Sequence, residues 1–157
     1  MNLSHIDSRG QARMVDVASK PESERSAIAR AVVRMSLETL IAARAGDLKK
    51  GDLRAVAELA GVMAAKRTAE LIPLCHPLPL TQIVVQLEFL EDLPGVEVTA
   101  SVRTVARTGV EMEALTAVSV AALTVYDMIK GLERGARISD IRLLEKHGGS
   151  SGDYVAE

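Results

Sequence analysis

The sequence predicts an α+β fold in which helices pack on one face of a mostly antiparallel sheet. Two neighbouring segments alternate apolar and polar residues as strands do, and three longer segments have helical periodicity. The two kinds do not alternate regularly along the chain, which disfavours a doubly wound parallel sheet. The 157 residues match one domain of ordinary size. We expect a single domain, residues 1–157, with an extended arm over 1–18, a short strand around 12–17, and a flexible tail over 147–157.

Two helices are predicted in the first half of the chain. The first is expected over residues 19–46, because Ser19 is a suitable N-cap, Pro21 falls in the first turn and Gly46 is a suitable C-terminal stop. Apolar residues recur within it at near-helical spacing. The second is expected over residues 52–70, where apolar side chains form one continuous face.

A rigid loop and two strands follow. Three prolines exclude a regular helix from residue 71 to 80 and predict a partly buried loop. Residues Thr81–Leu90 and Val96–Val105 then alternate in hydrophobicity, with the turn signal Leu93-Pro94-Gly95 between them. The sequence therefore predicts an antiparallel pair of strands.

The last helix is predicted from about Met112 to Leu132. It is apolar nearly all round and dense in alanine, so we expect it to be central and to lie close to its neighbours. Gly131 or Gly135 is expected to end it. Residues Ile138–Leu144 are predicted to form a further strand.

Composition excludes several classes of protein. The net charge is −2, from 19 basic and 21 acidic residues, and aromatic residues make up only 2%, so neither broad phosphate neutralisation nor base stacking on nucleic acid is expected. The one cysteine cannot form an intrachain disulfide. Without an apolar run near the start, or 18 uninterrupted apolar residues elsewhere, we expect no membrane association and a cytoplasmic protein.

Asp127 and Lys130 form the strongest pattern for proton transfer. Three positions apart on the last predicted helix, the carboxylate and the ammonium share one face. Such a pair is either an exposed ion pair of little consequence or a desolvated pair whose pKa values are tuned for acid–base chemistry. Because Asp127 ends an apolar helix, we expect a desolvated pair.

Other candidates lie at the start of that helix and in the proline loop. Glu111 and Glu113 are favourably placed for the helix dipole, and they could also accept hydrogen bonds from a guanine-like ring. Cys75 and His76 lack the spacing of a zinc site, so no metal site is predicted. Cys75 is expected to be buried, whereas His76 could equally donate to a ligand or have a structural role.

Each basic residue, taken singly, is typical of an exposed solubilising charge. Lys66 and Arg67 are unusual because they lie among small and apolar residues, and Arg25, Lys50 and Lys146 are further candidates. In a chain of net negative charge, cations that converge on one pocket would suit a polyanionic small molecule. The glycine-rich run 148–152 could offer backbone N–H groups to a phosphate, but a flexible tail is the preferred interpretation.

From the residues alone, the prediction is an α+β domain with an acid–base site for an anionic ligand. Over almost its whole length the chain also resembles the cyclic pyranopterin monophosphate synthase family, MoaC. The resemblance depends on long, ordered motifs: Ser4-His5-Ile6-Asp7, Met14-Val15-Asp16-Val17, Lys50-Gly51-Asp52, Ala64-Ala65-Lys66-Arg67-Thr68, Leu71-Ile72-Pro73-Leu74-Cys75-His76-Pro77, Thr108-Gly109-Val110-Glu111-Met112-Glu113, Tyr126-Asp127-Met128 with Lys130, and Gly148-Gly149.

The resemblance implies a lyase of molybdenum cofactor biosynthesis. Its substrate would be 3′,8-cyclo-7,8-dihydroguanosine 5′-triphosphate, and its products cyclic pyranopterin monophosphate and pyrophosphate. A ferredoxin-like fold is implied, as is a homo-hexamer built as a trimer of dimers with active sites between subunits. No cofactor is expected.

The resemblance also implies roles for individual residues. Asp127 and Lys130 would be the catalytic carboxylate and its partner. The residues matching substrate-contacting and pocket-lining positions are Leu74, Cys75, His76, Met112, Glu113, Lys50, Lys66, Arg25, Glu111 and Lys146. Ser150 stands where the family often has lysine, which leaves the role of the tail open.

Two other classes of function remain open at this point. A nucleotide-binding regulator could share the cationic pocket, and an assay for pyrophosphate release separates it from an enzyme. A structural oligomerisation module would need no acid–base pair, and it would bind neither GTP nor a pterin.

Overall fold

The structure, a computed structural model, describes residues 9–46 and 48–157. The elements are, in order, β1 (Ser23–Arg34), α1 (Leu37–Ala45), α2 (Leu53–Lys66), α3 (Thr68–Leu71), β2 (Leu80–Leu90), β3 (Gly95–Ala106), α4 (Glu111–Ile129), β4 (Arg137–His147) and β5 (Tyr154–Val155).

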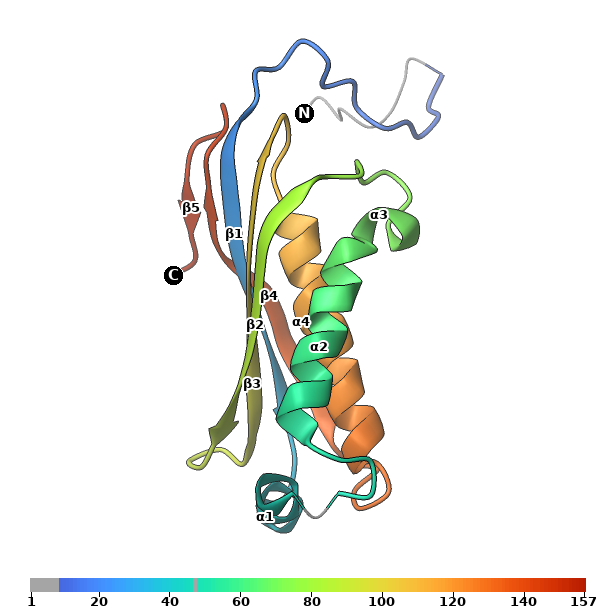
Figure 1. Cartoon of the computed structure of the whole chain (residues 1–157), viewed down its shortest axis with the longest axis vertical. Helices are drawn as coiled ribbons and strands as arrows, with labels where there is room; N and C mark the ends of the chain where they lie inside the picture. The colour runs from blue at the N-terminus through green and yellow to red at the C-terminus, as the bar shows by residue number, and fades with distance from the viewer. Residues whose placement is uncertain (1–8, 47) are drawn as a thin grey trace.

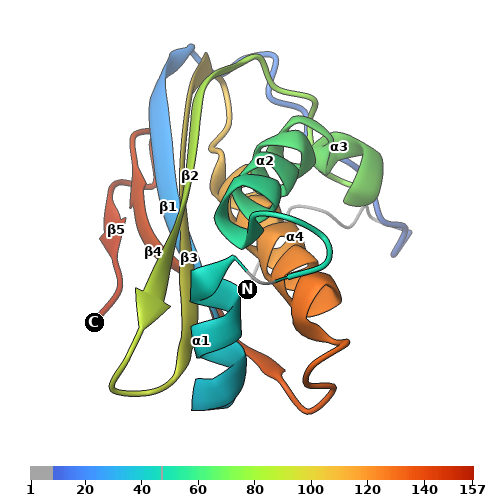
Figure 2. The same ribbon diagram turned by 60° about the horizontal axis from the view of Figure 1, so that its bottom comes forward.

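The strands form one antiparallel sheet in the order β2-β3-β1-β4-β5. Helices α2 and α4 lie side by side along one face of the sheet, and α1 lies across one end (Figures 1 and 2). This arrangement confirms the predicted α+β class. The order of β1 to β4 in the sheet is that of the ferredoxin-like fold, with β5 added at one edge.

The prediction of a helix over residues 19–46 is wrong for its first two thirds. Most of that part forms β1, which pairs with β3 on one side and β4 on the other. Ala27, Ala29, Ala31 and Val33 are all 0% exposed, so burial follows a period of two along this strand. Only the last part is helical: α1 begins after Ser36, whose hydroxyl accepts a hydrogen bond from the Thr39 amide at 3.2 Å.

The second predicted helix and the strand pair are confirmed. Asp52 caps α2 by accepting from the Ala55 amide at 2.8 Å, although α2 ends at Lys66 and the separate turn α3 follows. The proline loop leads into β2, and β2 pairs with β3 around Leu87 and Val98, both 0% exposed.

Helix α4 is central, as predicted. It packs against α2 and the sheet, and its buried positions are mostly alanine and valine. By length and composition α4 could cross a bilayer, but half of its apolar window is buried inside the protein, where it forms the core. Gly61 of α2 allows the close approach, because a Cβ there would meet Val85 at 3.0 Å and the Ala117 carbonyl oxygen at 3.1 Å. Ile129 is the last helical residue, slightly before the predicted end.

The two ends of the chain differ from expectation. Ala12 forms an isolated bridge instead of the short strand predicted around 12–17, and the motif over residues 4–7 lies outside the described residues. The strand predicted to end at Leu144 continues to His147. Instead of a flexible tail, the chain turns through residues 148–153 and returns as β5, which pairs with β4.

Candidate active site

One carboxylate between two lysines marks the C-terminal end of α4. Asp127 lies in the last turn, and Lys130 follows as the C-cap, with its Nζ 2.7 Å from Asp127 Oδ1. Lys50, from the segment between α1 and α2, contacts Asp127 Oδ2 and donates to the Asp127 carbonyl oxygen at 3.0 Å. All three line a cavity of about 500 Å³. The predicted neighbourhood of Asp127 and Lys130 is thus confirmed, and Lys50 joins it.

The predicted desolvation of this pair is wrong for the single chain. The Asp127 and Lys130 side chains are 51% and 52% exposed, although the neighbouring residues Met128 and Ile129 are buried. Hydrogen bonds from Lys130 and then Lys50 lower the pKa of Asp127 to about 2. The same contact with Asp127 raises the pKa of Lys130. Asp127 and Lys130 are therefore both charged at neutral pH in the single chain.

Removing the Lys50 ammonium is expected to weaken this charge balance. In Lys50→Met, Asp127 loses one of its two donors, so its pKa should rise from about 2 towards its ordinary 3.8. Carboxyl-detected NMR titration measures this directly. Lys49→Met, which removes a neighbouring cation from the same cavity wall, serves as the control, and equal shifts in the two variants would contradict a specific Lys50 contact.

A second cavity, of about 400 Å³, lies at the other end of α4. Its walls include Leu74, Cys75 and His76 of the proline loop, together with Glu111 and Met112 at the helix start. The arm closes one side: His76 Nε2 donates to the Val15 carbonyl oxygen at 2.7 Å, and Val15, Val17 and Lys20 line the cavity. His76 therefore has a structural contact in the free chain.

Glu113, in the first turn of α4 beside the cavity residue Met112, is only 3% exposed. Burial raises its pKa to about 7, an effect that its own backbone N–H opposes and Glu111 reinforces. Its Oε2 has no hydrogen-bond partner among the residues that the structure describes. Burial also raises the pKa of the Cys75 thiol, with further contributions from Glu113 and Glu111. The thiol is thus kept neutral, which disfavours nucleophilic catalysis by Cys75.

Two of the predicted cations lie near the glycine-rich turn at the end of β4. Arg25 of β1 packs against Gly148 and Gly149, and Lys146 of β4 contacts Ser151 and Gly152 of the same turn. Lys66 stands apart from both groups, exposed at the end of α2, and lines none of the cavities described above.

The predicted site residues thus form separate groups within one chain. Asp127 follows Met112 by fifteen positions, which corresponds to about 22 Å along the helix axis. The start of α4 lies at the same end of the molecule as the start of β1 and the end of β4 (Figure 1). The cavity beside the proline loop and the cations Arg25 and Lys146 therefore lie at one end, and Asp127 with its two lysines lies at the other.

Some residues of these cavities were not predicted as site residues. Lys49, Tyr126 and Arg134 line the cavity around Asp127, and the Tyr126 hydroxyl donates to the Arg134 carbonyl oxygen at 2.9 Å. Lys20 lines the second cavity. The sequence signal for Lys49 and Tyr126 is that they directly precede Lys50 and Asp127, whereas Arg134 has no such signal. Within residues 9–46 and 48–157, no cluster of three His, Cys, Asp or Glu side chains could hold a metal ion.

Comparison with known proteins identifies the family. The model of the MoaC family matches residues 14–149. The chain belongs to the MoaC family. All the site residues predicted above fall within the matched span, including the three around Asp127 and those of the proline loop.

Individual MoaC relatives are similar over nearly their full length. The chain is 61% identical over 155 residues to the cyclic pyranopterin monophosphate synthase of Thermomicrobium roseum, covering 99% of this chain and 93% of the relative. It is 57% identical over 155 residues to the synthase of Dinoroseobacter shibae, with coverages of 99% and 98%. It is 58% identical over 153 residues to that of Nostoc sp., with coverages of 98% and 91%.

Proposed function

We propose that this MoaC protein is a cyclic pyranopterin monophosphate synthase. It would convert 3′,8-cyclo-7,8-dihydroguanosine 5′-triphosphate to cyclic pyranopterin monophosphate and pyrophosphate, as a lyase of molybdenum cofactor biosynthesis. The observation that supports this most is the carboxylate of Asp127 between two ammonium groups on a cavity wall, in a chain so similar to synthases of that name.

The proton transfers are assigned to Asp127 and Lys130. Lys130, charged and in contact with Asp127, donates a proton as the five-membered purine ring opens. Asp127 holds both lysines and accepts a proton as the pterin ring closes. Substrate that covers the half-exposed pair removes water from it, which moves the two pKa values towards each other and makes transfer between them easier.

The cations serve the phosphate chemistry. In the second step a sugar hydroxyl attacks the α-phosphate, a new P–O bond forms, and the bond to the pyrophosphate leaving group breaks. Negative charge moves onto the leaving pyrophosphate, where fixed cations stabilise it. Arg25, Lys50, Lys66 and Lys146 are proposed for this role, while Glu111, Glu113, Met112 and the loop residues Leu74, Cys75 and His76 contact the base.

The active site is proposed to lie between copies of the chain. Asp127 and the proline loop belong to opposite ends of α4, too far apart to contact one small molecule within one chain. A symmetric dimer can bring the two ends of different copies together twice, once at each site. We propose a hexamer, a trimer of such dimers, located in the cytoplasm as a single-domain protein.

Mixing two inactive variants tests both the activity and the shared site. Asp127→Ala and His76→Ala are each expected to lose turnover alone. Coexpressed at equal amounts, they should regain about a quarter of wild-type activity, because half of the dimers are mixed and each mixed dimer holds one intact site. The measurement is release of pyrophosphate from the cyclised dihydroguanosine triphosphate, with fluorescence of the oxidised pterin product in parallel.

The outcomes separate the two parts of the proposal. Coexpression of Asp127→Ala with Lys130→Ala is the matched control, since both changes fall in the same half-site and no activity should return. Failure of the first mixture to recover, with an active wild-type protein, overturns the shared site alone. Absence of pyrophosphate release by the wild-type protein overturns the proposed activity.

A further inference from the structure

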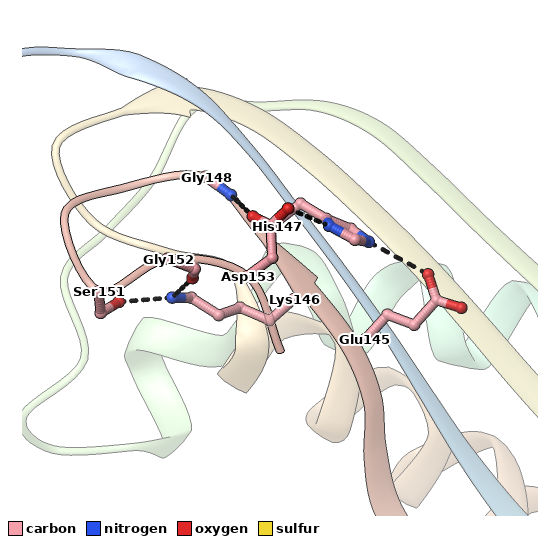
Figure 3. A network of polar contacts seen from close by, with 7 residues as sticks. All are labelled: Glu145, Lys146, His147, Gly148, Ser151, Gly152 and Asp153. Carbon is pink, nitrogen blue, oxygen red and sulfur yellow. Dashed lines mark hydrogen bonds and ion pairs between the residues drawn. The ribbon is translucent and has the colours of Figure 1, made fainter. Parts of the chain in front are cut away.

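His147, the last residue of β4, lies between two carboxylates (Figure 3). Its Nε2 is 3.2 Å from Glu145 Oε2, and its Nδ1 is 3.1 Å from Asp153 Oδ2. A carboxylate can only accept, so each ring nitrogen must carry a proton to form both contacts. The arrangement therefore requires the imidazolium form.

Asp153 connects this ring to the turn over residues 148–153. Its other oxygen, Oδ1, accepts from the Gly148 amide at 3.1 Å. Within the turn, the Gly152 amide donates to the Gly149 carbonyl oxygen at 3.3 Å. The two ends of the turn are thus joined through one carboxylate, and His147 fixes the orientation of that carboxylate.

The same turn holds Lys146. The ammonium donates to Ser151 Oγ at 2.5 Å and to the Gly152 carbonyl oxygen at 2.7 Å (Figure 3). An ammonium has three donors, and these contacts use two of them. The turn therefore fixes the position of Lys146 and leaves it able to donate to an anion.

Arg25 of β1 packs on the other side of the turn. Gly148 and Gly149 adopt φ values of +89° and +86°, and a Cβ at Gly149 would lie 1.7 Å from Arg25 Nη1. The bare glycine backbone is what allows the guanidinium to lie there. Arg25 and Lys146, two cations assigned above to the phosphates, thus both depend on one closed turn.

We propose that His147 is a positioning residue for triphosphate binding: as an imidazolium bound to Glu145 and Asp153, it holds closed the turn that places Arg25 and Lys146. The proposal rests on the function proposed above for those two cations. The affinity for triphosphate would then depend on the protonation of the His147 ring, in addition to that of the substrate and of Asp127 and Lys130.

The surroundings of the ring favour this proton. Charged and titratable groups surround the His147 ring on three elements and the turn. They are Glu145 and Lys146 of β4, Asp153 of the turn, Tyr154 of β5, and Glu24 and Arg25 of β1. The two β1 residues lie next to Ser26, which pairs with His147. Hydrogen bonds to Asp153 and then Glu145 raise the pKa of His147 above its ordinary value of 6.5. Above that raised pKa, one ring nitrogen presents a lone pair to a carboxylate, so one contact is lost and the turn loosens.

Binding of inorganic triphosphate to the assembled protein at pH 6 and pH 9 tests the proposal. Titration of the triphosphate itself is common to all variants, so only differences between proteins count. His147→Gln, which cannot bridge two carboxylates as a cation, should bind about tenfold more weakly than wild type at pH 6 and equally at pH 9. His147→Arg, charged at both pH values, should keep the tighter binding throughout.

Two outcomes overturn the proposal. One is triphosphate affinity in His147→Gln equal to or above that of wild type at pH 6, which would mean that the turn does not place the cations. The other is an NMR titration in which the His147 ring loses its proton at or below pH 6.5. Neither readout requires turnover. The role of His147 can therefore be rejected while the synthase activity is retained, and the synthase activity can be rejected while the role of His147 is retained.

Discussion

Asp127→Ala is expected to retain the fold and to lose turnover by about 10²- to 10⁴-fold, the range typical for loss of a positioned acid–base group. The carboxylate contacts both Lys50 and Lys130, so its removal leaves two ammonium groups facing each other without a counter-charge. Each lysine is then free to reorient, and neither is held for proton transfer. The measurement is the kcat for pyrophosphate release at saturating substrate.

The fold should survive because this side chain is half exposed at the end of a helix. Glu91→Ala is the matched control: that carboxylate is also exposed and also paired, with Arg44 Nη1 at 2.5 Å, but it lines neither of the two cavities assigned to the site. Its turnover should stay within about twofold of wild type. Near-normal turnover in Asp127→Ala would reject the catalytic assignment.

The neighbourhood of Asp127 and Lys130 could be predicted because it needs only a helix and a spacing of three. The Lys50 contact could not, because Lys50 comes from a segment whose path depends on how α1 and α2 pack. The predicted desolvation failed for a related reason. Periodicity identifies an apolar helix, but it does not indicate whether a polar side chain in its last turn faces the core or the solvent.

The N-terminal half shows where local patterns are ambiguous. Ser19, Pro21 and Gly46 satisfied the rules for helix ends, and the apolar residues between them recur at near-helical spacing, which favoured a helix. Pairing with β3 and β4 outweighed this preference, because a central strand gains hydrogen bonds on both edges and buries small side chains against α4. No local signal contains that information.

The glycine-rich tail was misinterpreted on composition. Glycine runs are typical of flexible linkers, but here Gly148, Gly149 and Gly152 all adopt positive φ values that close a turn. His147 and Asp153 were unremarkable in the sequence, because residues six apart meet only when a turn brings them together. Their contact could be found only in the structure.

Glu113 is expected to make the protein less stable as pH rises. Its pKa is about 7 in the folded chain and ordinarily 4.5, so the folded state binds more protons than the unfolded state between these values. The free energy of unfolding therefore falls as pH rises through this window, by about 3 kcal/mol in total. The physical cause is a carboxylate that ionises at 3% exposure with one oxygen unpartnered.

Glu113→Gln removes the ionisation while keeping the size of the side chain. Denaturant unfolding at pH 5 and pH 8.5, at one protein concentration, should show that this variant loses about 2.5 kcal/mol less stability than wild type across that interval. Glu88→Gln, at an exposed position on β2, should lose as much as wild type. An equal loss in Glu113→Gln and wild type would mean that Glu113 is already ionised at pH 5. An ionised Glu113 would need a buried hydrogen-bond donor for Oε2. Oε2 would then not be free to accept a hydrogen bond from an N–H of the substrate base.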